Sequence, residues 1–483
     1  MAQKNVKKNY IYNLIYQILL LITPLITTPY VSRILGADGI GEVSYVESVA
    51  SYFVLFATMG IATYGQREIS YVQDSIEKRS VVFWNAKILG ICTSCLSLIV
   101  YLLFSSTKPN AYIYFIFALN ILTVAMDITW FFQGMEEFGK IVLRNVILKI
   151  INILYIFTAI RSKSDVAMLA LGHVIFPLLS NISLWGILPK YICKVNVRNI
   201  RPFKDIRIIL SLFVPAIATQ VYTVLDKTMI GAITQSAFEN GYYEQALKIS
   251  RMVLAVITAL GTVMVPRIGY YFEKKDTKEV CRLMYRSYRF VWFLGVPLCF
   301  GLIMVSENFV PWFFGTGYEK VTSLLHILAF LILAIGISNV TGVQYLVPTK
   351  RQNALSVSVI LGACTNFMMN LFLIPRYGST GAAVASVVAE VVVTASQLYF
   401  VRKELSLFQI FREGIPYYIA GVLMSVVLHF VSLQLLPSIL NTAILVVSGA
   451  LVYFCVLLVL RDEFFISNIK SVLAKIRKKI ESN

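Results

Sequence analysis

The sequence predicts an all-α polytopic membrane protein with about fourteen transmembrane helices. Hydrophobic residues occupy 58% of the 483 positions, charged residues occupy only 14%, and the mean hydropathy is +0.74. Soluble domains are about 45–50% apolar and about 25% charged, so this composition excludes an ordinary soluble fold. The apolar residues recur in blocks of about 20 to 28, and about 20 helical residues cross a bilayer core. Strands of a membrane β-barrel would instead alternate over about ten residues.

Fourteen blocks have the required length. They lie at 10–32, 41–64, 81–104, 110–133, 141–160, 166–188, 206–233, 243–266, 286–306, 321–347, 353–374, 379–401, 414–436 and 439–460. Helices in these blocks satisfy every backbone hydrogen-bonding group internally, as hydrocarbon requires. The N-terminal segment MAQKNVKKN leads into a full span without a small-residue cleavage site, so we expect no cleavable signal peptide.

The distribution of basic residues predicts the orientation of these spans. With both termini in the cytoplasm, 32 of the 43 Lys and Arg residues lie in inward segments or within the first four residues of a span that begins there, six lie in outward loops and five lie deeper inside spans. This excess obeys the positive-inside rule. Topology therefore explains the net charge of +18, and we expect no nucleic acid partner. The basic loops are expected to lie along anionic membrane lipids.

An internal repeat predicts the domain organisation. At an offset of 200 residues, Gly41 aligns with Gly241 and Arg67 with Arg267. Parallel repeats are typical of transporters whose halves rock around a midplane site, although duplication also produces channels and scaffolds. We expect an N-terminal six-helix lobe (1–205), a parallel C-terminal six-helix lobe (206–403), two extra transmembrane helices (404–462) and a basic amphipathic cytoplasmic tail (463–483).

Enzyme motifs are absent from the sequence. It contains no GxxxxGK[ST], HExxH or GxSxG segment, and its three histidines fall in three different predicted spans. The loops are too short for a folded catalytic domain. We therefore expect a transporter without catalytic residues, without a metal site and without a cofactor.

Ionisable residues inside the spans are the candidate functional groups. The stretch YTVLDKTMIG places Asp226 beside Lys227 in an apolar helix, where each charge costs on the order of 3 kcal/mol or more. Such charges normally face a polar interior or a water-filled cavity. A path for an anion would use these cavity cations: Lys227, Lys248, Arg251, Lys149, Lys87 and Arg33. In the alternative interpretation, neighbouring acids merely neutralise these cations and hold helices together.

Four stretches carry a resemblance to a known family. They are TPYVSRILGADGIGEVSY (28–45), DITWFFQGMEEFGKIVLRN (127–145), LDKTMIGAITQSAFENGYYEQALKI (225–249) and LIPRYGSTGAAVASVVAEVV (373–392). In this order, they resemble signature stretches of the Wzx-like polysaccharide flippases of the multidrug/oligosaccharidyl-lipid/polysaccharide (MOP) exporter superfamily. The resemblance implies a MATE-like fold of two six-helix lobes around a central cavity. It also implies alternating-access transport of a polyprenyl (undecaprenyl) pyrophosphate-linked oligosaccharide to the outer leaflet, for capsule, O-antigen or another surface polysaccharide.

The chemistry of the residues fits such a cargo. Lys and Arg would bind the pyrophosphate, and Asn366 and Asn370, which share one helix face, would contact the glycan. With no nucleotide site, a proton or sodium gradient or consumption of the product would drive transport. The candidate ion-coupling or structural acids are Glu390, Asp226, Asp127 and Glu47. We rank Glu390 first for coupling, because burial raises a carboxyl pKa, and Asp226 first for structure.

Other functions share this architecture. A multidrug or cation antiporter and a lipid II flippase belong to the same superfamily, and a membrane polysaccharide-assembly enzyme or scaffold is a more distant alternative. The expected location is the inner or plasma membrane of a bacterium or archaeon, as a multi-pass protein with both termini in the cytoplasm. A polysaccharide polymerase and other assembly proteins are the expected protein partners.

Overall fold

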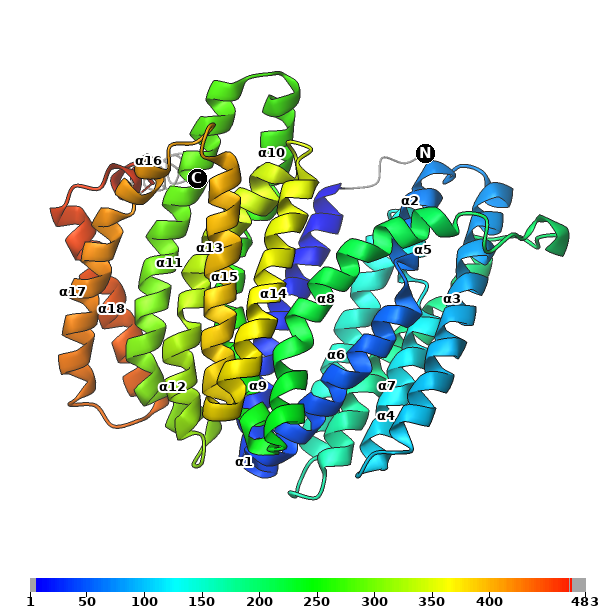
Figure 1. Ribbon diagram of the computed structural model, residues 1–483, viewed down its shortest axis with the longest axis horizontal. Coiled ribbons are helices and arrows are strands. Elements are labelled where there is room, and N and C mark those ends of the chain that lie inside the picture. Colours follow the sequence, from blue (N-terminus) through cyan, green and yellow to red (C-terminus); the bar gives the residue numbers. More distant parts are fainter. Residues whose placement is uncertain (1–5, 469, 471–483) are drawn as a thin grey trace, which may run out of the picture. The chain divides into compact units, whose positions relative to one another are not determined.

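The computed structural model describes residues 6–468 and 470 of the chain. Side chains at 6–16, 18, 21, 214–216, 218, 219, 221, 222 and 262 are outside that description. All regular secondary structure in the described residues is helical, with no β-strand, which confirms the all-α prediction. The chain divides into two compact units, Met1–Gly241 (unit 1) and Tyr242–Asn483 (unit 2), which Figure 1 colours from blue to green and from green to red.

Unit 1 contains the first eight α-helices and two short 3-10 helices. They are α1 (Val6–Thr58), α2 (Ile61–Tyr71), α3 (Ile76–Ser105), α4 (Ala111–Met126), α5 (Thr129–Gly134), α6 (Phe138–Ala159), α7 (Val166–Trp185), η1 (Leu188–Lys190), η2 (Val197–Asn199) and α8 (Ile206–Thr234). A buried apolar cluster formed mainly by α1, α3, α4 and α7 holds this unit together. A second cluster joins α2, α3 and α5 through aromatic side chains.

Unit 2 contains most of α9 and all later helices. They are α9 (Ala237–Thr258), α10 (Gly261–Glu273), α11 (Thr277–Phe314), α12 (Glu319–Leu328), α13 (Phe330–Ser338), the π-helix η3 (Asn339–Leu346), α14 (Gln352–Tyr377), α15 (Ser379–Val401), α16 (Leu407–Arg412), α17 (Ile415–Ser432) and α18 (Ile439–Val459). One apolar cluster connects α10, α11, α13, α15, α17 and α18.

The helices coincide with the predicted spans, since each of the fourteen segments falls largely on described helix. Among the described residues, eleven helices are long and apolar enough to cross a membrane, or twelve if the bent pair α9 and α10 forms one span. This number is lower than fourteen because α1 contains two predicted spans. In addition, α8, several of whose side chains lie outside the description, is not counted.

Gly36 separates the two predicted spans within α1. At Gly36 the backbone of α1 adopts φ 72° and ψ 176°, a conformation that is not helical. This left-handed region is open to glycine at little cost. A Cβ at this position would also lie 2.6 Å from Oδ1 of Asp38. We call the end of unit 1 at which Gly36 lies the Gly36 end.

The helix boundaries repeat at the offset seen in the sequence. The helix α1 ends at Thr58 and α9 ends at Thr258, while α2 begins at Ile61 and α10 at Gly261. This agreement supports an internal duplication. The compact units divide at Gly241, whereas the predicted lobes divide between residues 205 and 206. The lobe boundaries and the central cavity stay predictions.

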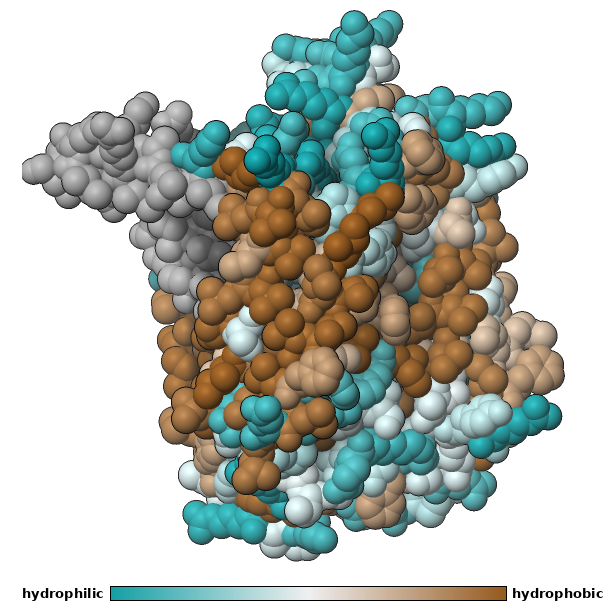
Figure 2. Space-filling view, turned by 90° about the vertical axis from the view of Figure 1, so that its left-hand side faces the viewer, coloured by the Kyte–Doolittle hydropathy of each residue, from teal (hydrophilic) through white to brown (hydrophobic). Residues whose placement is uncertain are grey.

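The two C-terminal helices pack within unit 2. Arg289 on α11 donates to the Asp462 carboxylate at 2.8 Å, and the Tyr417 hydroxyl on α17 lies within 3.2 Å of the same carboxylate. Figure 2 shows a continuous apolar face over this part of unit 2, bordered by hydrophilic side chains at both ends. Such a face suits contact with lipid tails. Most of the predicted amphipathic tail (463–483) lies outside the described residues.

Candidate functional site

Asp226 lies on the side of α8 that packs against α1. Its side chain is buried. Two residues further along α8, the Thr228 hydroxyl donates to Ser48 Oγ of α1 at 3.0 Å. The Tyr52 hydroxyl hydrogen-bonds with Thr228 and lies within electrostatic range of Asp226. We call Ser48, Tyr52, Asp226 and Thr228 the α1–α8 seam, and it provides the polar surroundings that a buried carboxylate requires.

Lys227 lies between Asp226 and Thr228 on α8. Its side chain is half-buried. Asp226 and Lys227 both have interaction partners in the structure. These contacts favour a structural role for Asp226, and the assignment of Lys227 to a substrate stays a prediction.

Glu47 forms a contact that sequence spacing could not indicate. Its Oε2 atom lies 3.4 Å from Nδ1 of His173 on α7. Both side chains are about two-fifths exposed. The carboxylate therefore accepts a hydrogen bond when this imidazole nitrogen carries a proton. This pair joins α1 to α7. In addition to Asp226 on α8, Glu47 on α1 is thus a second acid within a predicted span.

Lys87 and Asp127 lie together at the C-terminal end of α4. The Lys87 ammonium donates to the carbonyl oxygens of Ala125 and Asp127, the latter at 3.0 Å, and its side chain is only 3% exposed. The Asp127 carboxylate accepts from the Thr129 backbone N–H at 2.8 Å. Trp185 covers the ammonium, 5.1 Å from its ring centre. Since orphan carbonyls at a helix end need donors, this geometry favours a structural role for both residues.

The predicted cavity cations Arg33 and Lys149 of unit 1 do not belong to the α1–α8 seam. Arg33 is exposed on the first half of α1, close to the Gly36 end, and Lys149 is half-buried on α6. Both have interaction partners. Their assignment as substrate-binding cations stays a prediction.

In unit 2, α9 carries Glu244, Lys248 and Arg251 at positions i, i+4 and i+7, which share one helix face. Glu244 and Lys248 form an ion pair with 3.9 Å between Oε1 and Nζ, and both side chains are partly exposed. Arg251 is exposed and has its own partner. The structure thus confirms the i, i+4 contact, and it leaves both cations accessible enough to bind an anion.

The remaining candidates of unit 2 are buried. Asn370 donates to Asn366 at 3.1 Å, and both lie on the α14 face that packs against α15. Glu390 on α15 is buried too, and its backbone carbonyl accepts from Thr394 at 2.8 Å. All three side chains have partners. Contact between the two asparagines and a glycan would therefore require α14 and α15 to separate, and this assignment stays a prediction.

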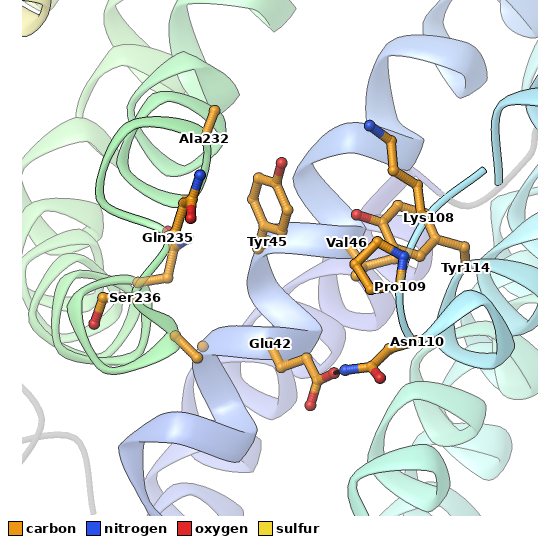
Figure 3. A pocket seen from close by; sticks show the side chains of 14 residues that line it. Glu42, Tyr45, Val46, Lys108, Pro109, Asn110, Tyr114, Ala232, Gln235 and Ser236 are labelled. Carbon is orange, nitrogen blue, oxygen red and sulfur yellow. Dashed lines mark hydrogen bonds between the residues drawn. The ribbon is translucent and has the colours of Figure 1, made fainter.

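A cavity that the sequence analysis missed lies at the Gly36 end of unit 1. Its volume is about 630 Å³. The lining comes from α1, the α3–α4 loop with the start of α4, and the end of α8 with the turn and the start of α9 that follow: Gly41, Glu42, Tyr45, Val46, Lys108, Pro109, Asn110, Tyr114, Gly231, Ala232, Gln235, Ser236, Ala237 and Asn240. In Figure 3, Tyr45 stands between Gln235 on one side and Lys108 with Tyr114 on the other. The polar residues come from three distant segments, so no local motif could signal them.

Comparisons with known proteins agree with this fold. The model of the family described as "Polysaccharide biosynthesis protein" matches residues 6–272. The "Putative O-antigen transporter" of Escherichia coli (strain K12) is 23% identical over 389 residues, covering 79% of this chain and 93% of that protein.

Two solved structures share the fold. One is the "Lipid II flippase MurJ, inward closed conformation", with a TM-score of 0.73 at 15% identity, covering 94% of this chain and 99% of the other. The other is the inward-facing conformation of a multidrug resistance MATE family transporter of the MOP superfamily, with a TM-score of 0.56 at 13% identity, covering 82% and 98%.

The fold is that of an all-helical, multi-pass membrane protein, with eleven or twelve candidate spans among the described residues, and it is shared with MurJ and a MATE transporter. The chain belongs to the polysaccharide biosynthesis protein family, whose model covers more than half of its length. The family predicted from the four sequence stretches is thereby confirmed.

Proposed function

We propose that this protein is a flippase that moves a polyprenyl pyrophosphate-linked oligosaccharide across the cytoplasmic membrane for surface polysaccharide synthesis. The match of residues 6–272 to the family model is the main support. The name of the Escherichia coli relative, an O-antigen transporter, agrees with a cargo of this class. Both termini would lie in the cytoplasm, as the basic loops predict.

The accessible cations support the proposal chemically. A pyrophosphate attracts ammonium and guanidinium groups most strongly where water is scarce. Lys248 and Arg251 on α9 are partly or fully exposed, and Lys227 on α8 is half-buried. We assign these three residues to the pyrophosphate. Lys87 is satisfied by carbonyl oxygens, so we assign it to the structure instead.

Depleting the protein in its own host tests the proposal. Lipid-linked oligosaccharide should accumulate, and its glycan should be accessible to lectin in inverted membrane vesicles but not in right-side-out vesicles. Surface polysaccharide should fall in parallel. An unchanged distribution between the leaflets would contradict a flippase. Loss of the lipid-linked oligosaccharide itself would indicate an assembly enzyme or scaffold.

A further inference from the structure

None of the three cations assigned above lines the cavity at the Gly36 end. All its lining residues lie within unit 1. A volume of about 630 Å³ lies within the usual range for small-molecule sites, about 300–1,000 Å³. The cavity is thus large enough to hold a ligand.

The polar groups of the cavity are already arranged. The Asn110 amide donates to the Glu42 carboxylate at 2.7 Å (Figure 3). The hydroxyls of Tyr45 and Tyr114 hydrogen-bond with each other. The backbone at Asn110 and Gln235 has φ of 58° and 51°, so two tight turns hold these amides at the cavity. Side chains positioned by turns and mutual hydrogen bonds lose little freedom when a ligand binds.

Asn240 indicates that a polar partner is missing. Its side chain is 1% exposed, and neither amide atom has a hydrogen-bond partner among the described residues. Buried polar groups are nearly always paired. A Cβ on Gly231 would lie 2.6 Å from the Asn240 amide nitrogen and 2.2 Å from the Tyr45 ring. Asn240 and Tyr45 therefore both pack close to Gly231 at the cavity.

The lining selects the chemistry of the ligand. The described lining residues include one acid, Glu42, and one base, Lys108, whose charges cancel. A phosphate would need more positive charge. An apolar ligand would leave the buried Asn240 amide unpaired. Tyrosine faces together with amide and carboxylate groups suit a neutral polyhydroxylated molecule, because each hydroxyl both donates and accepts.

We propose that this cavity is a glycan subsite, which binds neutral sugar units of the transported oligosaccharide at the Gly36 end. The proposal rests on the flippase function above. The basic-loop pattern predicts that the Gly36 end faces the outside. The subsite would hold the glycan after it has crossed the membrane, while the pyrophosphate contacts other residues.

Cysteine protection in the purified full-length protein tests the subsite. In a variant whose seven native cysteines are replaced, Gln235→Cys places a reporter at the cavity, and Glu136→Cys places one at a turn outside it. Glu136 has a comparable φ of 56° and is exposed. The probe is the free oligosaccharide released from the host's lipid-linked pool, and inorganic pyrophosphate is the comparison. We expect the oligosaccharide to slow maleimide labelling at 235 at least fivefold, with no effect at 136.

Two further variants identify the binding groups. Asn240→Leu keeps the approximate volume but removes both polar atoms. Asn110→Gly removes the amide and tolerates the left-handed backbone. Either change should abolish protection at 235. Unprotected labelling at 235, equal protection at 136, or equal protection by pyrophosphate would overturn the subsite. If any of these labelling results is obtained while depletion still causes leaflet-specific accumulation of the lipid-linked oligosaccharide, only the subsite is rejected. If the oligosaccharide protects position 235 but depletion causes no such accumulation, only the flippase function is rejected.

Discussion

Gly41 and Gly241, which align in the internal repeat, meet at one helix crossing in unit 1. A Cβ on Gly41 would lie 1.7 Å from the carbonyl oxygen of Ala237, and a Cβ on Gly241 would lie 1.8 Å from that of Ala37. Each repeat therefore contributes an Ala-x-x-x-Gly segment, and each glycine lies against the alanine of the other. Small residues at this spacing let helix backbones approach closely in membranes.

Replacing either glycine should destabilise the protein. Gly41→Ala and Gly241→Ala each add a methyl group where backbone atoms leave no room, so we expect a loss of about 1–3 kcal/mol. Thermal unfolding in detergent measures the change. Gly301→Ala is the matched control, because a Cβ there meets nothing within 4 Å. Equal unfolding temperatures for all three variants would show that the crossing is not tightly packed.

Lys87→Met should lower the amount of folded protein rather than the activity per molecule. It leaves the carbonyls of Ala125 and Asp127 without their donor, at a cost of about 1–3 kcal/mol each. Unfolding temperature and export per molecule separate the two effects, with Lys163→Met in the α6–α7 loop as the control. Normal stability with lost export would instead assign Lys87 to the substrate.

Replacing the cations of α9 should lower export per molecule rather than the amount of folded protein. Lys248 pairs with Glu244 at a partly exposed position, and such pairs contribute only about 0–1 kcal/mol. Lys248→Ala combined with Arg251→Ala should therefore keep the protein folded and reduce polysaccharide export at least tenfold. Export is normalised to protein abundance. Full export by the folded double variant would exclude a pyrophosphate contact at α9.

Glu390 tests the proposed ion coupling. The change Glu390→Gln preserves shape and hydrogen-bonding capacity but removes the ionisable group. We expect transport into proteoliposomes to lose its dependence on a proton or sodium gradient. If the dependence persists unaltered, Glu390 has a structural role only.

Topology can be measured in intact cells. Cysteines introduced at Asn199 and Lys275 should resist an impermeant maleimide, while those at Ser236 and Gly317 should react. Lys275 and Gly317 are exposed and lie between helices, so labels can reach both positions. Strong reaction at 275 would invalidate the predicted arrangement of spans.

The helices could be predicted from sequence because length and hydropathy alone decide whether a segment spans a membrane. The Glu244–Lys248 contact was predictable too, since both residues lie on one helix. Contacts between helices were not. Lys87 contacts the C-terminal end of α4, and Glu47 contacts His173 on α7. Both contacts depend on helix packing that no local sequence pattern encodes.

The same reason explains why the surroundings of other candidates could not be predicted. Asn366 and Asn370 share the predicted face, but that face packs against α15. The cavity at the Gly36 end escaped prediction because Glu42, Asn110 and Gln235 come from three separate segments. Its amides become a site only after the chain has folded.

Reconstitution tests the central claim most directly. Purified protein is incorporated into liposomes that carry fluorescent undecaprenyl pyrophosphate-linked oligosaccharide, with lipid II and a cationic dye as comparison cargoes. The account predicts rapid movement of the oligosaccharide between leaflets, and loss of this movement when Lys227, Lys248 and Arg251 are all changed to Ala. Folded wild-type protein that leaves the oligosaccharide in its original leaflet, or that moves only lipid II or the dye, would contradict it.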